Sequence, residues 1–161
     1  MKKLRIKLVL TDVDGVLTDG GMYYTAKGDI MKKFHTRDGM GITILKKFGI
    51  PTMIITKEKT PMVRIWSKQM KIKQLHEGII RKENILKDIC KKNDLLSNEI
   101  AYIGDDINDS VLLKHVGLSA TPSDGIDEIK QICNYVCKSK GGHGAFREFV
   151  DYILKYNEIL L

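Results

Sequence analysis

Three aspartates stand close together in the segment VLTDVDGVLTDGG, residues 9–21. Asp12 and Asp14 come directly after an apolar run, and a glycine-rich segment with Asp19 follows them. Carboxylates at the end of a buried strand repel each other and are costly to remove from water. The segment therefore predicts a partner that offsets this cost.

Further polar residues with possible chemistry follow other apolar runs. Thr56 ends the run IPTMIIT, and Lys82 opens a helical pattern. The segment GDDIND, residues 104–109, then supplies three more carboxylates directly after the strand-like AYI. These are Asp105, Asp106 and Asp109.

The elements that must carry these residues alternate between strand and helix. We predict strands over 6–14, 50–56, 99–106, 118–120 and near 134–137, and helices over 38–49, 60–71, 82–93, 108–117, near 124–132 and near 144–157. Buried strands that alternate with helices indicate a parallel sheet covered on both faces. Ligands of such sheets bind beyond the carboxyl ends of the strands. Asp12, Thr56 and Asp105 should therefore converge at one edge.

The converging carboxylates predict a hard cation. Mg²⁺ prefers oxygen ligands and binds through one or two carboxylates together with phosphate oxygens. With the ion in place, Asp12 could attack phosphorus and form an aspartyl-phosphate. Asp14 would then be the general acid and base. Thr56 would offer its hydroxyl and backbone N–H to the phosphoryl group, Lys82 would offer a positive charge, and Asp105 and Asp106 would hold the metal or its waters.

The segment 20–34 interrupts the alternation of strands and helices. It reads as a β-hairpin with its turn at Ala26 to Asp29. Its strands carry apolar side chains, and a two-stranded hairpin by itself is only marginally stable in water. We therefore expect the hairpin to pack in a homo-oligomer.

Composition narrows the class of protein. The 161 residues suggest one domain, 1–161, and carry a formal net charge of +7 with the basic residues dispersed. Because they form no long run and no aromatic ladder, we expect no nucleic-acid partner. Three cysteines without framework spacing and the lack of a long apolar stretch predict a cytoplasmic protein with reduced thiols and no membrane partner.

The motifs, taken in order, resemble the haloacid dehalogenase superfamily of Mg²⁺ phosphatases. The segments DVDGVLTDGGMYY, RDGMGITILKKFGI, AYIGDDINDSVLL and GGHGAFREFVDYIL resemble more narrowly its branch without a cap domain, which dephosphorylates 2-keto-3-deoxy sugar acids. The resemblance implies a Rossmann-like α/β three-layer sandwich with a mainly parallel sheet and a protruding hairpin. It also implies a homotetramer in which the hairpin covers a neighbour's active site.

The resemblance assigns roles to individual residues. It implies that Asp12 is the nucleophile, that Asp14 is the acid/base, and that Thr56 and Lys82 hold phosphate. It implies that Mg²⁺ binds the Asp12 carboxylate, the Asp14 backbone carbonyl and Asp105. Asp106 and Asp109 would then lie around that metal set.

One departure bears on the substrate. Octulosonate 8-phosphate phosphatases of lipopolysaccharide synthesis commonly read Thr-Gly-Arg after the second strand, whereas this chain reads Thr56-Lys57-Glu58. Glutamate cannot pair with a substrate carboxylate, and it is more typical of phosphatases of nine-carbon, sialic-acid-like nonulosonate 9-phosphates. We therefore prefer a nonulosonate 9-phosphate and keep 3-deoxy-D-manno-octulosonate 8-phosphate as the alternative.

Other residues also carry predictions. Arg37, Glu58 and Arg64 are predicted to contact the substrate, Asp38 is expected to cap a helix, and Trp66 is expected to serve helix packing and not to stack on a ligand. Gly141, Gly142 and Gly144 precede the last helix, where they either form a plain connection or gate the site.

Two other functions fit parts of the pattern. A response-regulator receiver also uses a carboxylate cluster with Thr and Lys, but the order of its motifs differs. A non-catalytic binding module, associated with a cytidylyltransferase, would lack catalytic residues, whereas every catalytic position is filled here.

Overall fold

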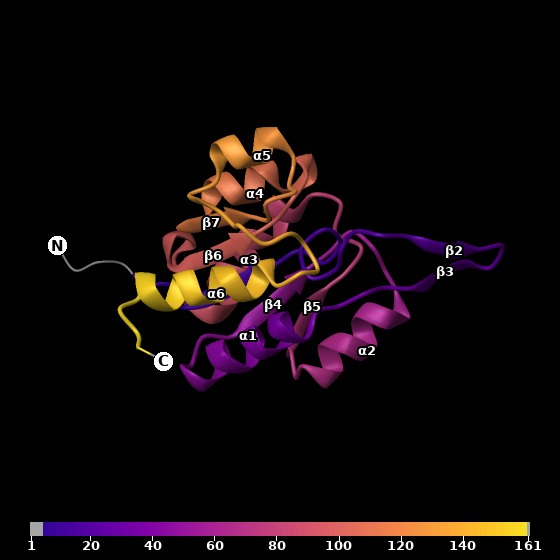
Figure 1. The fold of residues 1–161 in the computed structure, drawn as a ribbon. Coiled ribbons are helices and arrows are strands. Elements are labelled where there is room, and N and C mark those ends of the chain that lie inside the picture. Colours follow the sequence, from indigo (N-terminus) through magenta and orange to yellow (C-terminus); the bar gives the residue numbers. More distant parts are fainter. Residues whose placement is uncertain (1–4, 161) are drawn as a thin grey trace.

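The computed structural model describes residues 5–160. Within them, six parallel strands form one sheet in the order β5-β4-β1-β6-β7-β8 (Figure 1). The strands are β1 Leu8–Thr11, β4 Thr52–Ile55, β5 Gln74–His76, β6 Ile100–Ile103, β7 Leu118–Thr121 and β8 Tyr135–Val136. β1 pairs with β4 on one side and with β6 on the other. The strands that precede Asp12, Thr56 and Asp105 are therefore neighbours.

Helices cover both faces of the sheet. They are α1 Thr36–Lys47, α2 Pro61–Gln69, α3 Leu86–Asn93, α4 Ser110–His115, α5 Asp127–Ile132 and α6 Ala145–Tyr156. Successive strand residues point to opposite faces, so Val9 joins the core under α1, α2 and α6, whereas Leu8 and Leu10 join the core under α3, α4 and α5. This confirms the expected three-layer α/β fold.

The predicted elements are present, with different bounds, and one strand was missed. The pattern over 82–93 divides into a 3₁₀ helix, η1 Lys82–Ile85, followed by α3, and another 3₁₀ turn, η3 Ile107–Asp109, precedes α4. A third, η2 Ser97–Glu99, leads into β6. Strand β5 was not predicted, because its three half-buried residues form no apolar run. Only pairing with β4 identifies β5 as a strand.

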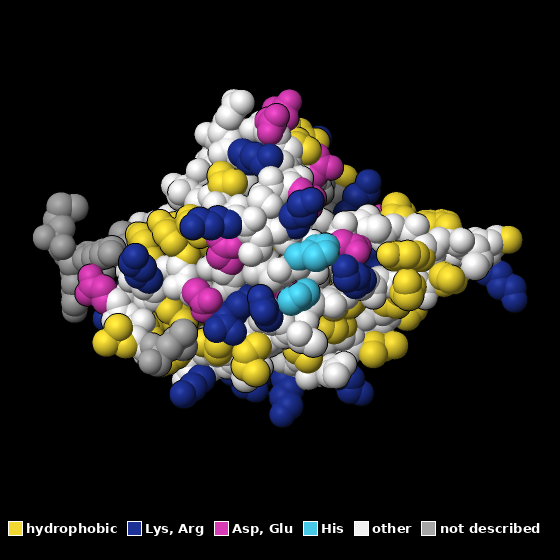
Figure 2. All heavy atoms as spheres, in the orientation of Figure 1, with side chains coloured by type: hydrophobic (Ala, Val, Ile, Leu, Met, Phe, Trp, Pro, Cys, Tyr) yellow, Lys and Arg dark blue, Asp and Glu magenta, His cyan; other side chains and the backbone are white. Residues whose placement is uncertain are grey.

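The hairpin consists of β2 Tyr23–Thr25 and β3 Gly28–Met31, and it stands away from the sheet (Figure 1). Its turn is shorter than predicted, because Gly28 already pairs with Thr25 and β3 begins there. The hairpin's large apolar side chains are exposed, and Figure 2 shows them clustered along it. They are Met22, Tyr23, Tyr24, Ile30 and Met31.

Asp38 does not cap its own helix, contrary to the prediction. Helix α1 starts earlier, and the His35 side chain accepts the Arg37 N–H as its cap. Asp38 is buried, and its Oδ1 accepts the backbone N–H of Arg147 at 2.9 Å. It therefore stabilises the start of α6, where free N–H groups favour a carboxylate.

The prediction for Trp66 is confirmed, because its ring stacks on Phe34 with 4.4 Å between centroids. In residues 5–160 no helix combines the length and the apolar character that crossing a membrane requires.

The glycine-rich segment before α6 presses against the loop that follows β1. A Cβ on Gly141 would lie 1.9 Å from the Gly15 carbonyl oxygen, and Gly142 donates its N–H to the Val16 carbonyl. Gly142 also has a positive φ, which favours glycine. The segment thus supports the loop that carries Asp14, while its predicted gating role stays a prediction.

Candidate active site

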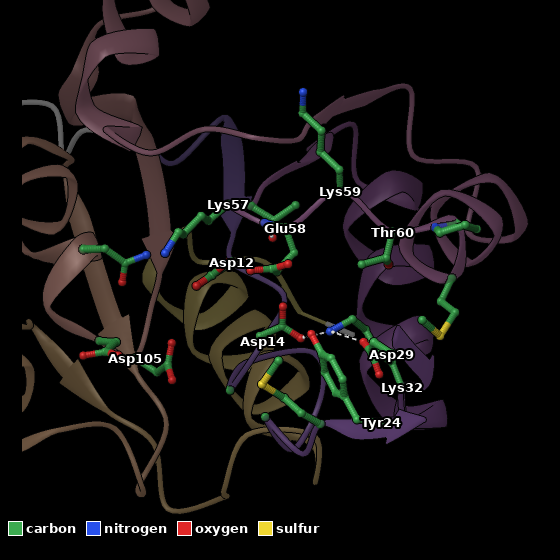
Figure 3. A pocket seen from close by; sticks show the side chains of 18 residues that line it. Asp12, Asp14, Tyr24, Asp29, Lys32, Lys57, Glu58, Lys59, Thr60 and Asp105 are labelled. Carbon is green, nitrogen blue, oxygen red and sulfur yellow. Dashed lines mark hydrogen bonds and ion pairs between the residues drawn. The ribbon is translucent and has the colours of Figure 1, made fainter. Parts of the chain in front are cut away.

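A cavity of about 500 Å³ opens at the carboxyl ends of β1, β4 and β6 (Figure 3). Asp12, Thr56 and Asp105 all line it, so the predicted convergence is present. The foot of the hairpin and the segment after β4 form the rest of the wall. The remaining lining residues are Asp14, Gly15, Gly20, Met22, Tyr24, Asp29, Lys32, Lys57, Glu58, Lys59, Thr60, Pro61, Met62, Asp106 and Asn108.

Asp12 is held at the base of the cavity by both of its carboxylate oxygens. Its Oδ1 accepts the backbone N–H of Val13 at 2.7 Å, and its Oδ2 lies 2.8 Å from Lys82 Nζ. Its exposed fraction is only 6%. The carboxylate is thus fixed in orientation while it still faces the cavity, as a nucleophile requires.

Lys82 is fully buried and does not line the cavity. Its Nζ lies 2.7 Å from Asp109 Oδ1 and 3.2 Å from the Tyr102 hydroxyl, in addition to Asp12. Tyr102 in turn donates its hydroxyl proton to Asp109 Oδ1 at 2.5 Å. Because every partner of the ammonium is polar and placed by a different element, this network compensates a cation that could not otherwise be buried.

Asp109 organises the loop after β6. Its Oδ2 accepts the backbone N–H of Asp105 at 3.0 Å and that of Asp106 at 3.3 Å. Gly104 permits this approach, because a Cβ there would lie 2.5 Å from the Asp109 carboxylate. Both Asp109 oxygens are therefore engaged within the protein. Asp106 instead accepts the Ile107 N–H at 2.7 Å and caps η3.

Gly15 brings Asp105 up to the loop of Asp12 and Asp14. It has a positive φ, and a Cβ on it would lie 1.9 Å from Asp105 Oδ2. Both the backbone conformation and the close approach of Asp105 therefore require glycine at this position.

The carboxylates at the base of the cavity hold their protons more tightly than usual. Burial is the largest cause, and it outweighs the opposing charge of Lys82. Together with the charge of the nearby Asp109, burial raises the pKa of Asp12 from 3.8 to about 7. Burial and the charges of Asp12 and Asp109 raise the pKa of Asp105 to about 8. One lysine is shared by three carboxylates, so the site has an excess of negative charge.

A divalent cation fits this excess of charge. Carboxylate oxygens of Asp12, Asp105 and Asp109 lie within 4.8 Å of one another. Because Asp109 is engaged by Lys82, Tyr102 and two backbone N–H groups, Asp12 and Asp105 are the side chains that can turn toward an ion. Oxygen donors alone are the ligand set that Mg²⁺ takes. The side chain of Asp14 lies outside this cluster. This agrees with the expectation that Asp14 binds the ion through its backbone carbonyl.

Asp14 is bound to the hairpin side of the cavity. Its Oδ1 lies 2.6 Å from Lys32 Nζ, and Lys32 Nζ lies 3.5 Å from Asp29 Oδ2 (Figure 3). Burial by itself would lower the pKa of Lys32, but its hydrogen bond to Asp14 and the charges of Asp14 and Asp29 raise it.

The expectation that Thr56 offers its backbone N–H to a ligand is wrong. That N–H donates to the His76 carbonyl at 2.8 Å, because the unpredicted β5 extends the sheet beside β4. The Thr56 hydroxyl accepts the Glu58 N–H at 3.3 Å and still lies in the cavity wall. It remains the group of Thr56 that a ligand can reach.

The three predicted substrate contacts lie in different places. Glu58 lines the cavity. Arg64 lies outside the lining and pairs with Glu77, with 2.9 Å between Nε and Oε2. Arg37 is exposed and is also not among the lining residues.

Sequence reasoning missed Lys32, Tyr102, Asp29 and the cavity-facing role of Lys57. Lys57 and Lys59 flank Glu58, and in Figure 3 Lys57 extends over Asp12 whereas Lys59 points away from it. A weak signal existed for Tyr102, because a tyrosine in a buried strand needs a partner for its hydroxyl. No local signal marked Lys32, which stands beside another lysine in the sequence.

Comparison with known proteins defines the class. Residues 45–149 match the family model of haloacid dehalogenase-like hydrolases. The chain belongs to this family of hydrolases, which excludes the response-regulator alternative.

The relatives point to a particular branch of the family. The chain is 38% identical over 150 residues to the 3-deoxy-D-manno-octulosonate 8-phosphate phosphatase of Haemophilus influenzae, covering 93% of this chain and 83% of that protein. It is 35% identical to the Escherichia coli K12 phosphatase of the same name, over 95% of this chain and 81% of that one.

Solved structures agree with these relatives. The cobalt-bound phosphatase of H. influenzae superposes with a TM-score of 0.93 at 37% identity, over 98% of this chain and 92% of that one. The enzyme of Moraxella catarrhalis, in complex with magnesium, phosphate and a KDO molecule, superposes with a TM-score of 0.92 at 34% identity, over 98% and 90%.

Proposed function

We propose that this protein is a Mg²⁺-dependent phosphatase that hydrolyses 3-deoxy-D-manno-octulosonate 8-phosphate. One observation carries the proposal: Asp12 faces a cavity at the sheet edge with Asp105 beside it and a buried Lys82 behind it. Nucleophile, metal ligands and a compensating cation are the parts that phosphoryl transfer to a carboxylate needs.

The reaction has two halves. An oxygen of Asp12 forms a bond to phosphorus while the bond from phosphorus to the sugar oxygen breaks, and Asp14 gives a proton to that departing oxygen. A water then attacks the phosphorus of the aspartyl-phosphate and passes its proton to Asp14, which releases phosphate and restores Asp12. Thr56 contributes its hydroxyl to the phosphoryl oxygens, and Lys82 keeps Asp12 oriented.

Asp12, Asp105 and the backbone of Asp14 would hold Mg²⁺. When bound, the ion supplies positive charge to the phosphoryl oxygens and removes the repulsion between the carboxylates. Asp109 supports this site by fixing the Asp105 backbone, and Asp106 by capping the following turn.

The relatives favour an eight-carbon substrate over the nine-carbon substrate that we preferred from sequence. That preference depended on Glu58, which stands where octulosonate phosphatases commonly carry an arginine and which cannot pair with a substrate carboxylate. The cavity wall supplies Lys57 and Lys59 on either side of Glu58, so a carboxylate has cationic partners there. The nonulosonate 9-phosphate is therefore the competing outcome of the test.

A non-catalytic module is the alternative of another class. A binding function does not require an aspartate that faces the cavity at 6% exposure and is oriented by a fully buried lysine, as Asp12 is by Lys82. The homo-oligomer predicted from the hairpin, a homotetramer by the resemblance, is part of our proposal and is supported by the hairpin's exposed apolar side chains.

The test is phosphate release from the two sugar-acid phosphates with Mg²⁺ and with chelator. We expect turnover of the octulosonate 8-phosphate with Mg²⁺, higher kcat/KM than for the nonulosonate 9-phosphate, and loss of turnover with chelator. Asp12→Asn should lower kcat by at least about 10³-fold. Asp151→Asn, an exposed carboxylate on α6, is the matched control and should keep full activity.

Preference for the nine-carbon substrate would overturn the assignment of the substrate. Full activity of Asp12→Asn would overturn the phosphatase mechanism itself.

A further inference from the structure

Lys32 is a buried ammonium group between two carboxylates at the foot of the hairpin. Its side chain is 3% exposed, although the lysine beside it, Lys33, is 49% exposed. Its Nζ lies 2.6 Å from Asp14 Oδ1 and 3.5 Å from Asp29 Oδ2. Burying an ammonium is costly, and it persists only where such partners compensate it.

The contact engages one oxygen of Asp14 only. Thr18 Oγ1 approaches the same atom, Oδ1, at 3.3 Å. With Oδ1 held from two sides, the carboxyl plane of Asp14 is fixed, and Oδ2 remains the oxygen that can exchange a proton in the cavity. Efficient proton transfer to a departing oxygen depends on such fixed geometry.

We propose that Lys32 is a positioning residue for Asp14 in its role as general acid, with Asp29 holding Lys32 in place from strand β3. This inference rests on the proposed function, since it assumes that Asp14 protonates the leaving group.

The step affected is the first half of the reaction. As the bond from phosphorus to the alcohol oxygen breaks, its electron pair goes to that oxygen, and the Asp14 proton goes to the same atom. The negative charge left on the Asp14 carboxylate lies beside the Lys32 ammonium. A cation already in place when charge develops lowers the barrier without reorganisation.

The hairpin thereby becomes part of the catalytic geometry. Asp29 lies within β3 and Lys32 directly after it, whereas Asp14 lies on the loop after β1 (Figure 3). A displacement of the hairpin would move the ammonium that orients Asp14.

The test compares two leaving groups in the full-length protein with Mg²⁺. An alkyl phosphate, the sugar-acid phosphate, needs protonation of its alcohol, whereas p-nitrophenyl phosphate releases a phenolate that leaves without it. The ratio kcat/KM reports only steps up to leaving-group departure, so it isolates the acid from the later base. Lys32→Met is the variant, because it keeps length and apolar volume, and Lys33→Met is the matched control.

We expect Lys32→Met to lower kcat/KM for the alkyl phosphate by about 100-fold and for p-nitrophenyl phosphate by less than about threefold. Lys33→Met should change neither by more than about twofold, because its ion pair is exposed and long. Lys32→Arg, which restores a cation, should recover part of the lost rate. A purely structural role would lower both substrates equally, and that result, or no loss on the alkyl phosphate, would overturn the proposal.

Two further variants separate this inference from the proposed function. If Asp12→Asn is inactive and Asp14→Asn shows the leaving-group difference while Lys32→Met does not, only the role of Lys32 fails. If Asp12→Asn stays active, the proposed phosphatase mechanism is overturned, whatever the result for Lys32→Met. If circular dichroism shows that Lys32→Met does not fold, Asp29→Asn takes its place. Asp29→Asn should then show the same selective fall in kcat/KM for the alkyl phosphate, but a smaller one. Equal falls for the two substrates would overturn the proposal.

Discussion

The base of the cavity and its rim are built on different principles. At the base, Lys82, Asp109 and Tyr102 are fully buried, and each polar atom meets a partner from another element. At the rim, Lys57, Glu58 and Lys59 are exposed side chains on the connection between β4 and α2.

Under the proposed function, this difference assigns the chemistry to the base and the choice of substrate to the rim. Buried, fully paired groups hold their geometry and are costly to change. Exposed side chains on a connection can be exchanged at small cost to the fold. We therefore expect substitutions at the base to cost stability and turnover together, and substitutions at the rim to change substrate affinity.

The largest effect is expected at the base. Lys82→Met leaves Asp12 and Asp109 without their shared cation and should lower the free energy of unfolding by about 3–5 kcal/mol. Urea denaturation followed by circular dichroism measures this. Lys130→Met removes a partly exposed i,i+3 pair with Asp127 and should cost less than about 1 kcal/mol. Equal costs for the two variants would contradict the role of Lys82 as the shared, buried cation of the base.

A second prediction uses the raised pKa values at the base. Asp12 and Asp105 have pKa values of about 7 and about 8 when folded without metal, above the 3.8 of the free side chain. The folded state therefore binds these protons more tightly than the unfolded state. In chelator, the stability they contribute should be highest below the unfolded pKa of 3.8 and fall as the pH rises from there to about 8.

Mg²⁺ should reverse this trend, because it competes with protons for the same oxygens. The rise in Tm on adding Mg²⁺ should thus be larger at about pH 8.5 than at about pH 5.5. Differential scanning calorimetry at both pH values measures this rise in Tm. The Asp105→Asn variant should lose most of the rise. A rise in Tm independent of pH would contradict the metal assignment at these carboxylates.

The smallest effect is expected at the rim. Lys57→Met should raise KM for the sugar-acid phosphate by about tenfold with little change in kcat, since it removes a charge pairing of about 1.4 kcal/mol. Lys59→Met, whose side chain points away from Asp12 in Figure 3, should raise KM less. A phosphate ester without a carboxylate should show no difference between the variants. A similar fall in kcat for both lysine variants would instead assign the rim a part in the chemistry.

Much of the base could be predicted from the sequence because its parts are local. Asp12 and Asp105 each follow a short apolar run, and a parallel sheet brings the ends of such runs together. The prediction that Thr56 gives its backbone N–H to a ligand failed for a non-local reason. Strand β5 takes that N–H, and its three residues carry no apolar pattern of their own.

The sequence by itself determined the fold class, the edge at which the site forms and the residue that we propose as the nucleophile. These depend on hydrophobic periodicity and on the position of polar residues relative to it, which are properties of short segments. Only the tertiary structure decided the partners of those residues: Tyr102 and Asp109 for Lys82, Lys32 for Asp14, and Arg147 for Asp38. Such pairings join segments that are distant in the chain, so they exist only once the layers have packed.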